Sequence, residues 1–315
     1  MPVPELKEAC SGRISEIVIG AAPDQGGTRS CGITVGGAQT LPGLDFDGEV
    51  GRQPAVAMDV LDVLPDDWPQ ALLDTFGNAA RNPGDWAKRC VEEFGAEMIC
   101  LKLDGIHPDG AGHSAGQAAD AALSVLKAVP VPLIVWGCEN AEADGAVLPK
   151  VSQAVRGERC LIGPATESNY KVLAATCLAD GHSLITSAPL DINMARQVNI
   201  LVSDMDFPLD RIVMYQTTGA LGYGLEYAYS IQERQRLMAL GGDRLMSMPV
   251  ICDVGTEAWR AKEAKVADHP DAGWTWELIT ATTLLQSGVD IFRMWHPKAA
   301  QRLRKGIDEI VSGYS

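Results

Sequence analysis

Eight short apolar runs recur along the chain, and they constrain its fold more than any other feature. Each run has at most nine residues, is rich in Val, Ile, Leu or Met, and ends near Gly, Asp, Pro or Thr. Such runs predict strands that are buried on both faces, as in a parallel sheet. They span Pro54–Asp62, Glu97–Asp104, Val131–Gly137, Arg159–Gly163, Ser183–Ala188, Arg211–Gln216, Met248–Val254 and Val289–Met294.

Helical patterns alternate with these runs. The first begins after a capping residue, Asn82, and stops at Gly95; the second opens with a capping Ser114. The predicted helices span Pro83–Phe94, Ser114–Val129, Glu167–Leu178, Ile192–Met205, Glu226–Leu240, Trp274–Gln286 and Pro297–Val311, with a weaker pattern over Gly145–Val155, which contains Pro149. Strands that each lead into a helix predict an α/β fold, a (β/α)₈ TIM barrel, with an open doubly wound sheet as the alternative.

The region before the first barrel strand has a different pattern. The segments Ser15–Ala21 and Ser30–Gly37 read as a β-hairpin, with Pro23 and two glycines between them. We therefore expect residues 1–53 to form an N-terminal hairpin extension that packs on the bottom of the barrel, and residues 54–315 to form the barrel itself.

Charge and cysteine spacing exclude several classes of protein. The formal net charge is −15, which disfavours nucleic acid and anionic membrane surfaces as partners. No apolar stretch reaches eighteen residues, and residues 1–15 carry no signal-peptide pattern. The eight cysteines form no CxxC pair, so we expect buried thiols in a cytoplasmic protein, with no metal or iron–sulfur cluster held by this chain.

Polar side chains at strand ends are the first functional candidates, because barrel enzymes work at the carboxyl ends of their strands. Lys102 lies between two leucines, so strand alternation points Lys102 and Asp104 into the barrel. An interior lysine can form a Schiff base. The simpler reading is a structural ion pair with an inward carboxylate such as Asp253 or Asp59. His107 and His113 read as solvated loop residues, and His296 reads as a strand-end histidine.

Two further motifs follow late strands. Gly219-Ala-Leu-Gly-Tyr-Gly224 does not have the G-x-G-x-x-G order of a dinucleotide site, but its three glycines predict either a tight turn or a close approach of backbone to a ligand. Trp259 and Arg260 suggest an exposed anchor for a partner protein. An ordinary helix face is the alternative for this pair.

Five stretches, spread over nearly the whole chain, together resemble one known family. They are Asp24-Gln-Gly-Gly-Thr-Arg-Ser30, Leu101-Lys-Leu-Asp-Gly105, Pro189-Leu-Asp-Ile-Asn193, Gly219-Ala-Leu-Gly-Tyr-Gly-Leu-Glu-Tyr227, and Met248-Pro-Val-Ile-Cys-Asp-Val-Gly255 running into Glu257-Ala-Trp-Arg-Ala-Lys-Glu-Ala264. In this order and spacing, they resemble the small subunit of the corrinoid iron–sulfur protein, which is also the delta subunit of the acetyl-CoA decarbonylase/synthase complex.

The resemblance implies a (β/α)₈ barrel that has no catalytic residue of its own and pairs with a large subunit. The large subunit carries the iron–sulfur cluster, and the two subunits share a corrinoid at their interface. Its cobalt takes a methyl group from methyltetrahydrofolate, or a methyltetrahydropterin, through a methyltransferase and passes it to CO dehydrogenase/acetyl-CoA synthase in the reductive acetyl-CoA (Wood–Ljungdahl) pathway. The implied corrinoid-binding residues are Asn193, Thr217, Thr218, Gly219, Gly222, Tyr223 and Gly224, with Lys102, Asp104 and Asp253 as polar residues inside the barrel and Trp259 and Arg260 at the partner interface.

Three other readings stay open. A methyltetrahydrofolate:corrinoid methyltransferase uses a related barrel with its own pterin pocket, a Schiff-base lyase would use Lys102, and a purely structural subunit would not touch the cofactor at all. The chain departs from the family pattern at Tyr215-Gln216, where members carry Asp-Pro. This departure concerns the detail of the corrinoid contacts.

Overall fold

All eight predicted strands are present and form one parallel sheet. The computed structural model describes residues 10–266, 269 and 271–313. The strands are β3 (Ala55–Leu61), β4 (Met98–Lys102), β5 (Leu133–Trp136), β6 (Leu161–Ala165), β7 (Ser183–Ser187), β8 (Ile212–Tyr215), β9 (Ile251–Asp253) and β10 (Ile291–Met294). They are hydrogen-bonded in the order β8-β7-β6-β5-β4-β3-β10-β9.

The sheet closes into a barrel between β8 and β9, where pairing is reduced to one bridge, Met214 to Val250. Side chains of the following helix cover this seam. Gln235 accepts a hydrogen bond from Gln216 at 2.6 Å and donates to the carbonyls of Met246 and Met248. Buried backbone groups need such partners where a strand ladder is incomplete. The barrel prediction is confirmed, and the open-sheet alternative is wrong.

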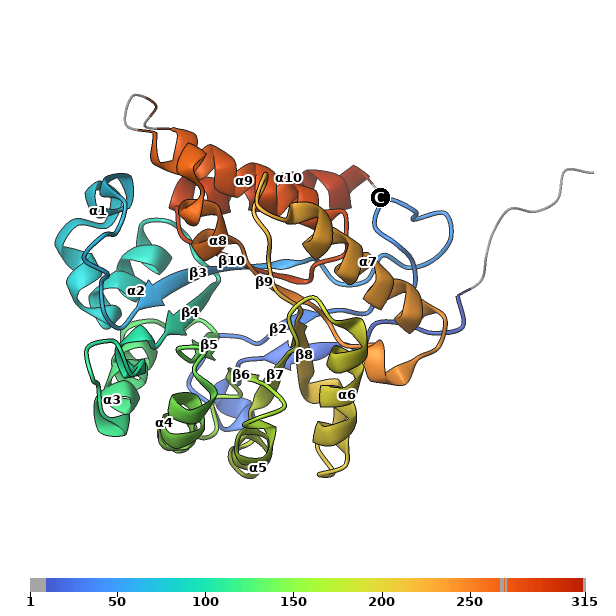
Figure 1. The fold of residues 1–315 in the computed structure, drawn as a ribbon, viewed down its shortest axis with the longest axis horizontal. Coiled ribbons are helices and arrows are strands. Elements are labelled where there is room, and N and C mark those ends of the chain that lie inside the picture. The colour runs from blue at the N-terminus through green and yellow to red at the C-terminus, as the bar shows by residue number, and fades with distance from the viewer. Residues whose placement is uncertain (1–9, 267–268, 270, 314–315) are drawn as a thin grey trace, which may run out of the picture.

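Helices surround the strands as a ring (Figure 1). They are α1 (Gln70–Phe76), α2 (Pro83–Glu92), α3 (Ala115–Ala128), α4 (Ala141–Ala154), α5 (Tyr170–Asp180), α6 (Ile192–Ser203), α7 (Leu225–Leu240), α8 (Val254–Arg260), α9 (Ala272–Leu285) and α10 (Pro297–Gly313), with short 3₁₀ turns η1 (Pro23–Gln25), η2 (Gly77–Arg81), η3 (Asp104–Ile106), η4 (Leu209–Arg211), η5 (Arg244–Met246) and η6 (Lys262–Lys265). Among the described residues, none of these helices combines the length and apolarity needed to cross a lipid bilayer.

The weakest predicted helix differs most from the structure. It begins at Ala141, four residues earlier than predicted, because Asn140 caps it by accepting a hydrogen bond from the backbone N–H of Ala143 at 3.0 Å. Pro149 lies inside α4 rather than ending it. The residue four positions earlier is Gly145, which leaves room around the carbonyl that the proline ring approaches. The two seven-residue helices α1 and α8 were not predicted.

The predicted hairpin is also confirmed, and it fills the bottom of the barrel. Strands β1 (Ile17–Ile19) and β2 (Ile33–Val35) pair antiparallel. Ile17, Ile19 and Val35 share one buried cluster with inward side chains of the barrel strands, such as Met98. A separate, larger cluster lies between the strands and the helices. The hairpin therefore contributes to the inner core; the division at residue 53 into extension and barrel stays a prediction.

Candidate functional site

An ion-paired cluster occupies the inside of the barrel toward the carboxyl ends of the strands. Arg293 on β10 is fully buried between two carboxylates. Its Nη2 lies 2.7 Å from Asp59 Oδ2, and its Nη1 lies 3.1 Å from Asp253 Oδ2. Sequence reasoning missed Arg293, although the alternation argument used for Lys102 applies to an arginine between Phe292 and Met294.

Two aromatic rings pack beside this ion-paired cluster and complete the interior of the barrel. The guanidinium of Arg293 lies over the Trp136 ring, 4.0 Å from its centroid. Trp136 meets the Tyr215 ring edge-to-face at 4.8 Å between centroids. A cation over a tryptophan face is favourable, more so when it is desolvated. The centre of the barrel is thus closed by side chains of the chain itself.

Lys102 forms the predicted structural ion pair, but not with the expected partners. Its Nζ lies 3.4 Å from Asp104 Oδ1 and 4.0 Å from Glu139 Oε1, while Asp59 and Asp253 are held by Arg293. Burial alone would lower the pKa of Lys102, but the surrounding carboxylates outweigh it and the pKa is raised. A protonated amine does not attack a carbonyl, so this geometry disfavours the Schiff-base reading.

The pKa values of the two carboxyl groups beside Arg293 are shifted in opposite directions. Burial raises the pKa of Asp59 to about 6, even with Arg293 opposing it. Burial also acts to raise the pKa of Asp253, but the charges of Arg293 and Lys102 and the hydrogen bonds of Thr256 outweigh it, so that pKa is lowered. When two carboxylates share one guanidinium, their pKa values move apart in this way.

A third buried carboxyl group lies behind the cluster. Glu277 on α9 accepts hydrogen bonds from Trp259 Nε1 at 2.8 Å, from the backbone N–H of Trp295 at 2.5 Å and from that of His296 at 3.1 Å. Burial nevertheless raises the pKa of Glu277 to about 8. Trp295 connects it to the cluster, because its indole N–H donates to Asp59 at 3.2 Å.

This buried glutamate predicts a pH dependence of stability. The folded pKa of Glu277 lies above the ordinary 4.5, so the folded state binds the extra proton and loses stability as pH rises from 4.5 to about 8. The loss is about 1.4 kcal/mol per pH unit across that window. Urea unfolding between pH 6.5 and 8, above the titration of Asp59, is expected to show this slope. Glu277→Gln should flatten it, and Glu309→Gln on the exposed face of α10 should not. Equal slopes for the wild type and Glu277→Gln would contradict the assignment.

The glycine loop after β8 is a tight turn anchored on α9. The backbone N–H of Leu221 donates to Thr280 at 3.2 Å, and its carbonyl accepts from Trp276 at 3.1 Å. A Cβ on Gly219 would lie 2.3 Å from the carbonyl oxygen of Gly224. Gly222 (φ 76°) and Gly224 (φ 94°) adopt the left-handed conformation that glycine tolerates. The turn reading of these glycines is confirmed, and a ligand contact by them stays a prediction.

The side chains predicted for the cofactor are not all on the rim. Thr218 is buried, and its hydroxyl oxygen accepts a hydrogen bond from the backbone N–H of Asp253 at 2.8 Å, so this side chain does not face the rim. Tyr223 is 47% exposed and its hydroxyl donates to Glu263 at 3.0 Å. Asn193 is exposed at the start of α6, and Thr217 is half-buried. The Tyr223 hydroxyl also accepts from the backbone N–H of Lys262 at 3.3 Å, so Asn193, Thr217 and the ring of Tyr223 remain available at the rim.

The expectation of an exposed Trp259 is wrong. Trp259 is 3% exposed, because its indole N–H donates to the buried Glu277 and its ring stacks on His296. Arg260 is exposed and pairs with Glu257 at 2.5 Å. A partner contact by Arg260 stays a prediction, without the aromatic anchor.

One histidine also differs from its prediction. His113 is not a solvated loop residue, because its Nδ1 lies 3.1 Å from the buried Asp62, which also accepts from the backbone N–H of Gly105 at 2.9 Å. This contact fixes the loop that follows β4. His296 follows β10 as predicted. Its ring accepts a hydrogen bond from the backbone N–H of Lys298 at 3.1 Å, and burial lowers its pKa to about 4.

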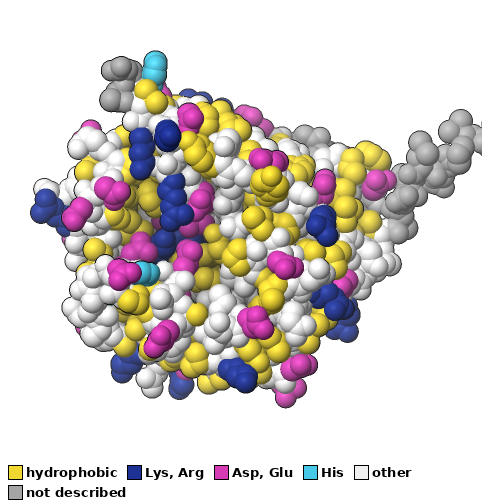
Figure 2. All heavy atoms as spheres, viewed as in Figure 1, with side chains coloured by type: hydrophobic (Ala, Val, Ile, Leu, Met, Phe, Trp, Pro, Cys, Tyr) yellow, Lys and Arg dark blue, Asp and Glu magenta, His cyan; other side chains and the backbone are white. Residues whose placement is uncertain are grey.

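The rim of the barrel combines strained backbone with exposed apolar side chains. Glu139 (φ 66°), Leu190 (φ 54°) and Thr217 (φ 82°) follow β5, β7 and β8 in the left-handed region, which is rare for a β-branched residue. Large apolar side chains at the starts of α6 and α7 are exposed: Leu190 (53%), Met194 (36%), Tyr223 (47%) and Tyr227 (63%). Figure 2 shows apolar patches on this view of the molecule beside a hollow where acidic and basic side chains gather.

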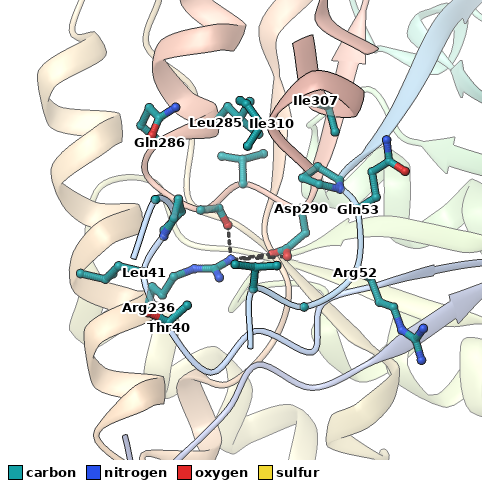
Figure 3. Close-up of a pocket in the computed structure, with 17 residues that line it drawn as sticks. Thr40, Leu41, Arg52, Gln53, Arg236, Leu285, Gln286, Asp290, Ile307 and Ile310 are labelled. Carbon is teal, nitrogen blue, oxygen red and sulfur yellow. Dashed lines mark hydrogen bonds and ion pairs between the residues drawn. The ribbon is translucent and has the colours of Figure 1, made fainter. Parts of the chain in front are cut away.

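A second hollow, of about 110 Å³, lies at the amino ends of the strands (Figure 3). Arg236 of α7 reaches into it, donates to the carbonyl of Gly288 and lies 3.4 Å from Asp290. Asp290 also accepts from the backbone N–H of Val250 at 2.9 Å. Because this end of a barrel serves stability and the pair is neutral, we assign Arg236 and Asp290 a structural role.

Among the described residues, no group of three or more His, Cys, Asp or Glu side chains is arranged to hold a metal ion.

Comparison with known proteins places the chain in a family. The model of the CO dehydrogenase/acetyl-CoA synthase delta subunit family matches residues 16–294. The chain belongs to this family. The acetyl-CoA decarbonylase/synthase complex subunit delta of Archaeoglobus fulgidus is 36% identical over 95% of this chain and 69% of its own length. The corresponding subunit of Methanocaldococcus jannaschii is 32% identical over 96% of this chain and 76% of its own length.

Solved structures of dihydropteroate synthases share the fold of this chain. The dihydropteroate synthase of Yersinia pestis, in a sulfonamide drug complex, superimposes with a TM-score of 0.57 and 14% identity over 87% of this chain and 98% of its own. That of Thermus thermophilus gives a TM-score of 0.55 and 14% identity over 82% of this chain and 94% of its own. At this identity, the likeness concerns the architecture of the (β/α)₈ TIM barrel alone and says nothing of the reaction.

Proposed function

We propose that this chain is the small subunit of a corrinoid iron–sulfur protein, and that the rim of its barrel covers a corrinoid held jointly with a large subunit. Family membership supports a role in the acetyl-CoA decarbonylase/synthase complex. The observation that carries the proposal further is the rim, where Leu190, Tyr223 and Tyr227 are exposed around neutral polar groups. Exposed apolar patches of this kind mark interaction sites.

The charges inside the barrel support the same proposal. Arg293 is neutralised by Asp59 and Asp253, and Lys102 by Asp104 and Glu139. These pairs engage the charged side chains inside the barrel with one another, in keeping with a subunit that binds a cofactor. Since Trp136 and Tyr215 fill the centre of the barrel, a deep pterin pocket of the methyltransferase type has little room there.

The chain's own residues would bind and shield the cofactor. Asn193, Thr217 and Tyr223 lie where they can meet the edge of a flat macrocycle, and the anchored turn Gly219–Gly224 keeps that edge rigid. A bound corrinoid would supply the cobalt that carries the methyl group from methyltetrahydrofolate or a methyltetrahydropterin to acetyl-CoA synthase. The proposed partners are the large subunit, the methyltransferase and CO dehydrogenase/acetyl-CoA synthase, in the cytoplasm.

Co-expression with the candidate large subunit tests this proposal. We expect size-exclusion chromatography to show a one-to-one complex with corrinoid absorbance, and the chain alone to be colourless. The double variant Leu190→Asp/Tyr227→Asp should abolish or strongly weaken the complex, while Leu178→Asp, an exposed leucine on α5, should not. A chain that stays solitary beside its large subunit, or a complex without corrinoid, would overturn the proposal.

A further inference from the structure

A polar cavity lies on the rim beside the filled centre of the barrel. It has a volume of about 150 Å³, well above the roughly 10–15 Å³ that one water molecule requires. It opens between the carboxyl ends of four successive strands, β5, β6, β7 and β8. Its polar lining comes from Glu139, Asp144, Thr166, Asn169, Ser187, Tyr215 and Thr217.

Asn169 lines this cavity, and its side chain carries a buried donor that is not used. Its side chain is 6% exposed, and its Oδ1 accepts from the backbone N–H of Thr166 at 2.7 Å. A backbone N–H can only donate, so this contact fixes which atom of the amide is oxygen. The Nδ2 group has no hydrogen-bond partner within the described part of the chain. A buried amide left in this state is costly without a ligand or water.

Three hydroxyl groups line the same space. Ser187 and Tyr215 are each 7% exposed, and Thr217 is half-buried with its strained backbone. The structure gives none of these hydroxyl groups a hydrogen bond to any described residue. A hydroxyl can both donate and accept. Glu139 adds acceptor oxygens at the edge, where it binds the indole N–H of Trp136 at 3.1 Å.

Asp144 closes the floor without contributing free atoms. Its Oδ1 accepts from the backbone N–H of Cys138 at 2.8 Å and its Oδ2 from that of Glu139 at 3.1 Å. These bonds hold Glu139 in its left-handed conformation. The cavity therefore has one free amide donor, three free hydroxyl groups and a neighbouring carboxylate, all on rigid strand ends.

We propose that this cavity binds a primary carboxamide group of the ligand. A carboxamide has one carbonyl oxygen that can accept from Asn169 Nδ2, and an NH₂ group that can donate to Ser187, Tyr215 or Glu139. A carboxylate in the same place would face Glu139 and lose both donors, so an anion is disfavoured. This inference rests on the proposed function, in which the ligand is a corrinoid whose edge carries such amides.

Matched ligands and variants of the heterodimer test the inference. The probes are dicyanocobinamide, which carries carboxamides, and dicyanocobyrinic acid, which carries carboxylates instead. We expect the wild-type complex to bind the amide probe at least about tenfold more tightly. Asn169→Asp keeps the acceptor for Thr166 but replaces the free donor, and it should weaken amide binding about fivefold to tenfold. Ser187→Ala and Tyr215→Phe should each weaken it about threefold. Asn78→Asp, which adds the same charge on exposed η2, is the control.

The outcomes separate this inference from the proposed function. If the wild-type complex binds the amide probe and all three cavity variants bind within twofold of it, the carboxamide site is wrong while the proposed function stands. If the wild-type complex binds neither probe, the proposed function fails. In that case, NMR titration of the chain with propionamide and propionate decides the cavity: amide binding that Asn169→Asp removes supports the site, and equal or no binding rejects it.

Discussion

Replacing Arg293 by alanine is expected to lower the free energy of unfolding by about 3–5 kcal/mol, enough to unfold a marginal domain. The substitution leaves Asp59 and Asp253 buried inside the barrel without their counter-charge. It also removes the cation that lies over the Trp136 ring. Urea unfolding followed by circular dichroism measures the loss.

A matched set of variants separates charge from packing. Arg293→Met combined with Asp59→Asn and Asp253→Asn removes the charges together, and it should recover most of the stability, because replacing a whole buried ion pair costs far less than breaking it. Arg260→Ala removes an exposed arginine whose partner is Glu257, and should change stability by less than about 1 kcal/mol. A loss in Arg293→Ala no larger than that in Arg260→Ala would contradict the role of the cluster.

Replacing Arg29 by alanine is expected to cost about 3–4 kcal/mol. Arg29 is 2% exposed and pairs with Glu158 at 2.9 Å. It also donates to the carbonyls of Leu126 at 2.8 Å, Val129 at 2.5 Å and Val131 at 3.2 Å, just where α3 ends. A cation at a helix C-terminus satisfies carbonyls that have no partner in the helix. Thermal and urea unfolding both report this loss.

Arg156→Ala is the control for Arg29→Ala. Arg156 also pairs with a carboxylate in this region, Asp180, at 2.5 Å, but its side chain is 62% exposed. We expect its loss to cost about 1 kcal/mol or less, since water screens an exposed pair. Similar effects of the two substitutions would show that the contacts of Arg29 at the end of α3 add nothing. The contacts of Arg29 also give the stretch Asp24–Ser30 a structural role, because they link the hairpin region to the barrel.

Much of the fold was predictable because its signals are local. Apolar runs and capping residues such as Ser114 depend only on neighbours in sequence, and Ser114 forms the expected capping box with Gln117. The ends of β7 and β8 were likewise predictable as rim positions. The short α8 was not, because Val254–Arg260 follows β9 without a break and has no amphipathic pattern long enough to detect.

The site was less predictable, because its contacts join distant parts of the chain. Alternation placed Lys102 inside the barrel, yet its partners depended on which strands neighbour β4 and how far each side chain reaches. Trp259 read as exposed because a tryptophan beside an arginine on a short helix gives no sign of burial. Its partner, Glu277, lies eighteen residues away on another helix.

The sequence by itself determined that this chain forms eight parallel strands alternating with helices behind a hairpin, since periodicity and turn residues act over short distances. Its motifs also determined the family. Only the tertiary structure decided that Arg293 rather than Lys102 neutralises Asp59 and Asp253, and that Asn169, Ser187, Tyr215 and Thr217 line one cavity. Barrel closure and strand stagger set which side chains meet, and these are properties of the whole sheet rather than of any one segment.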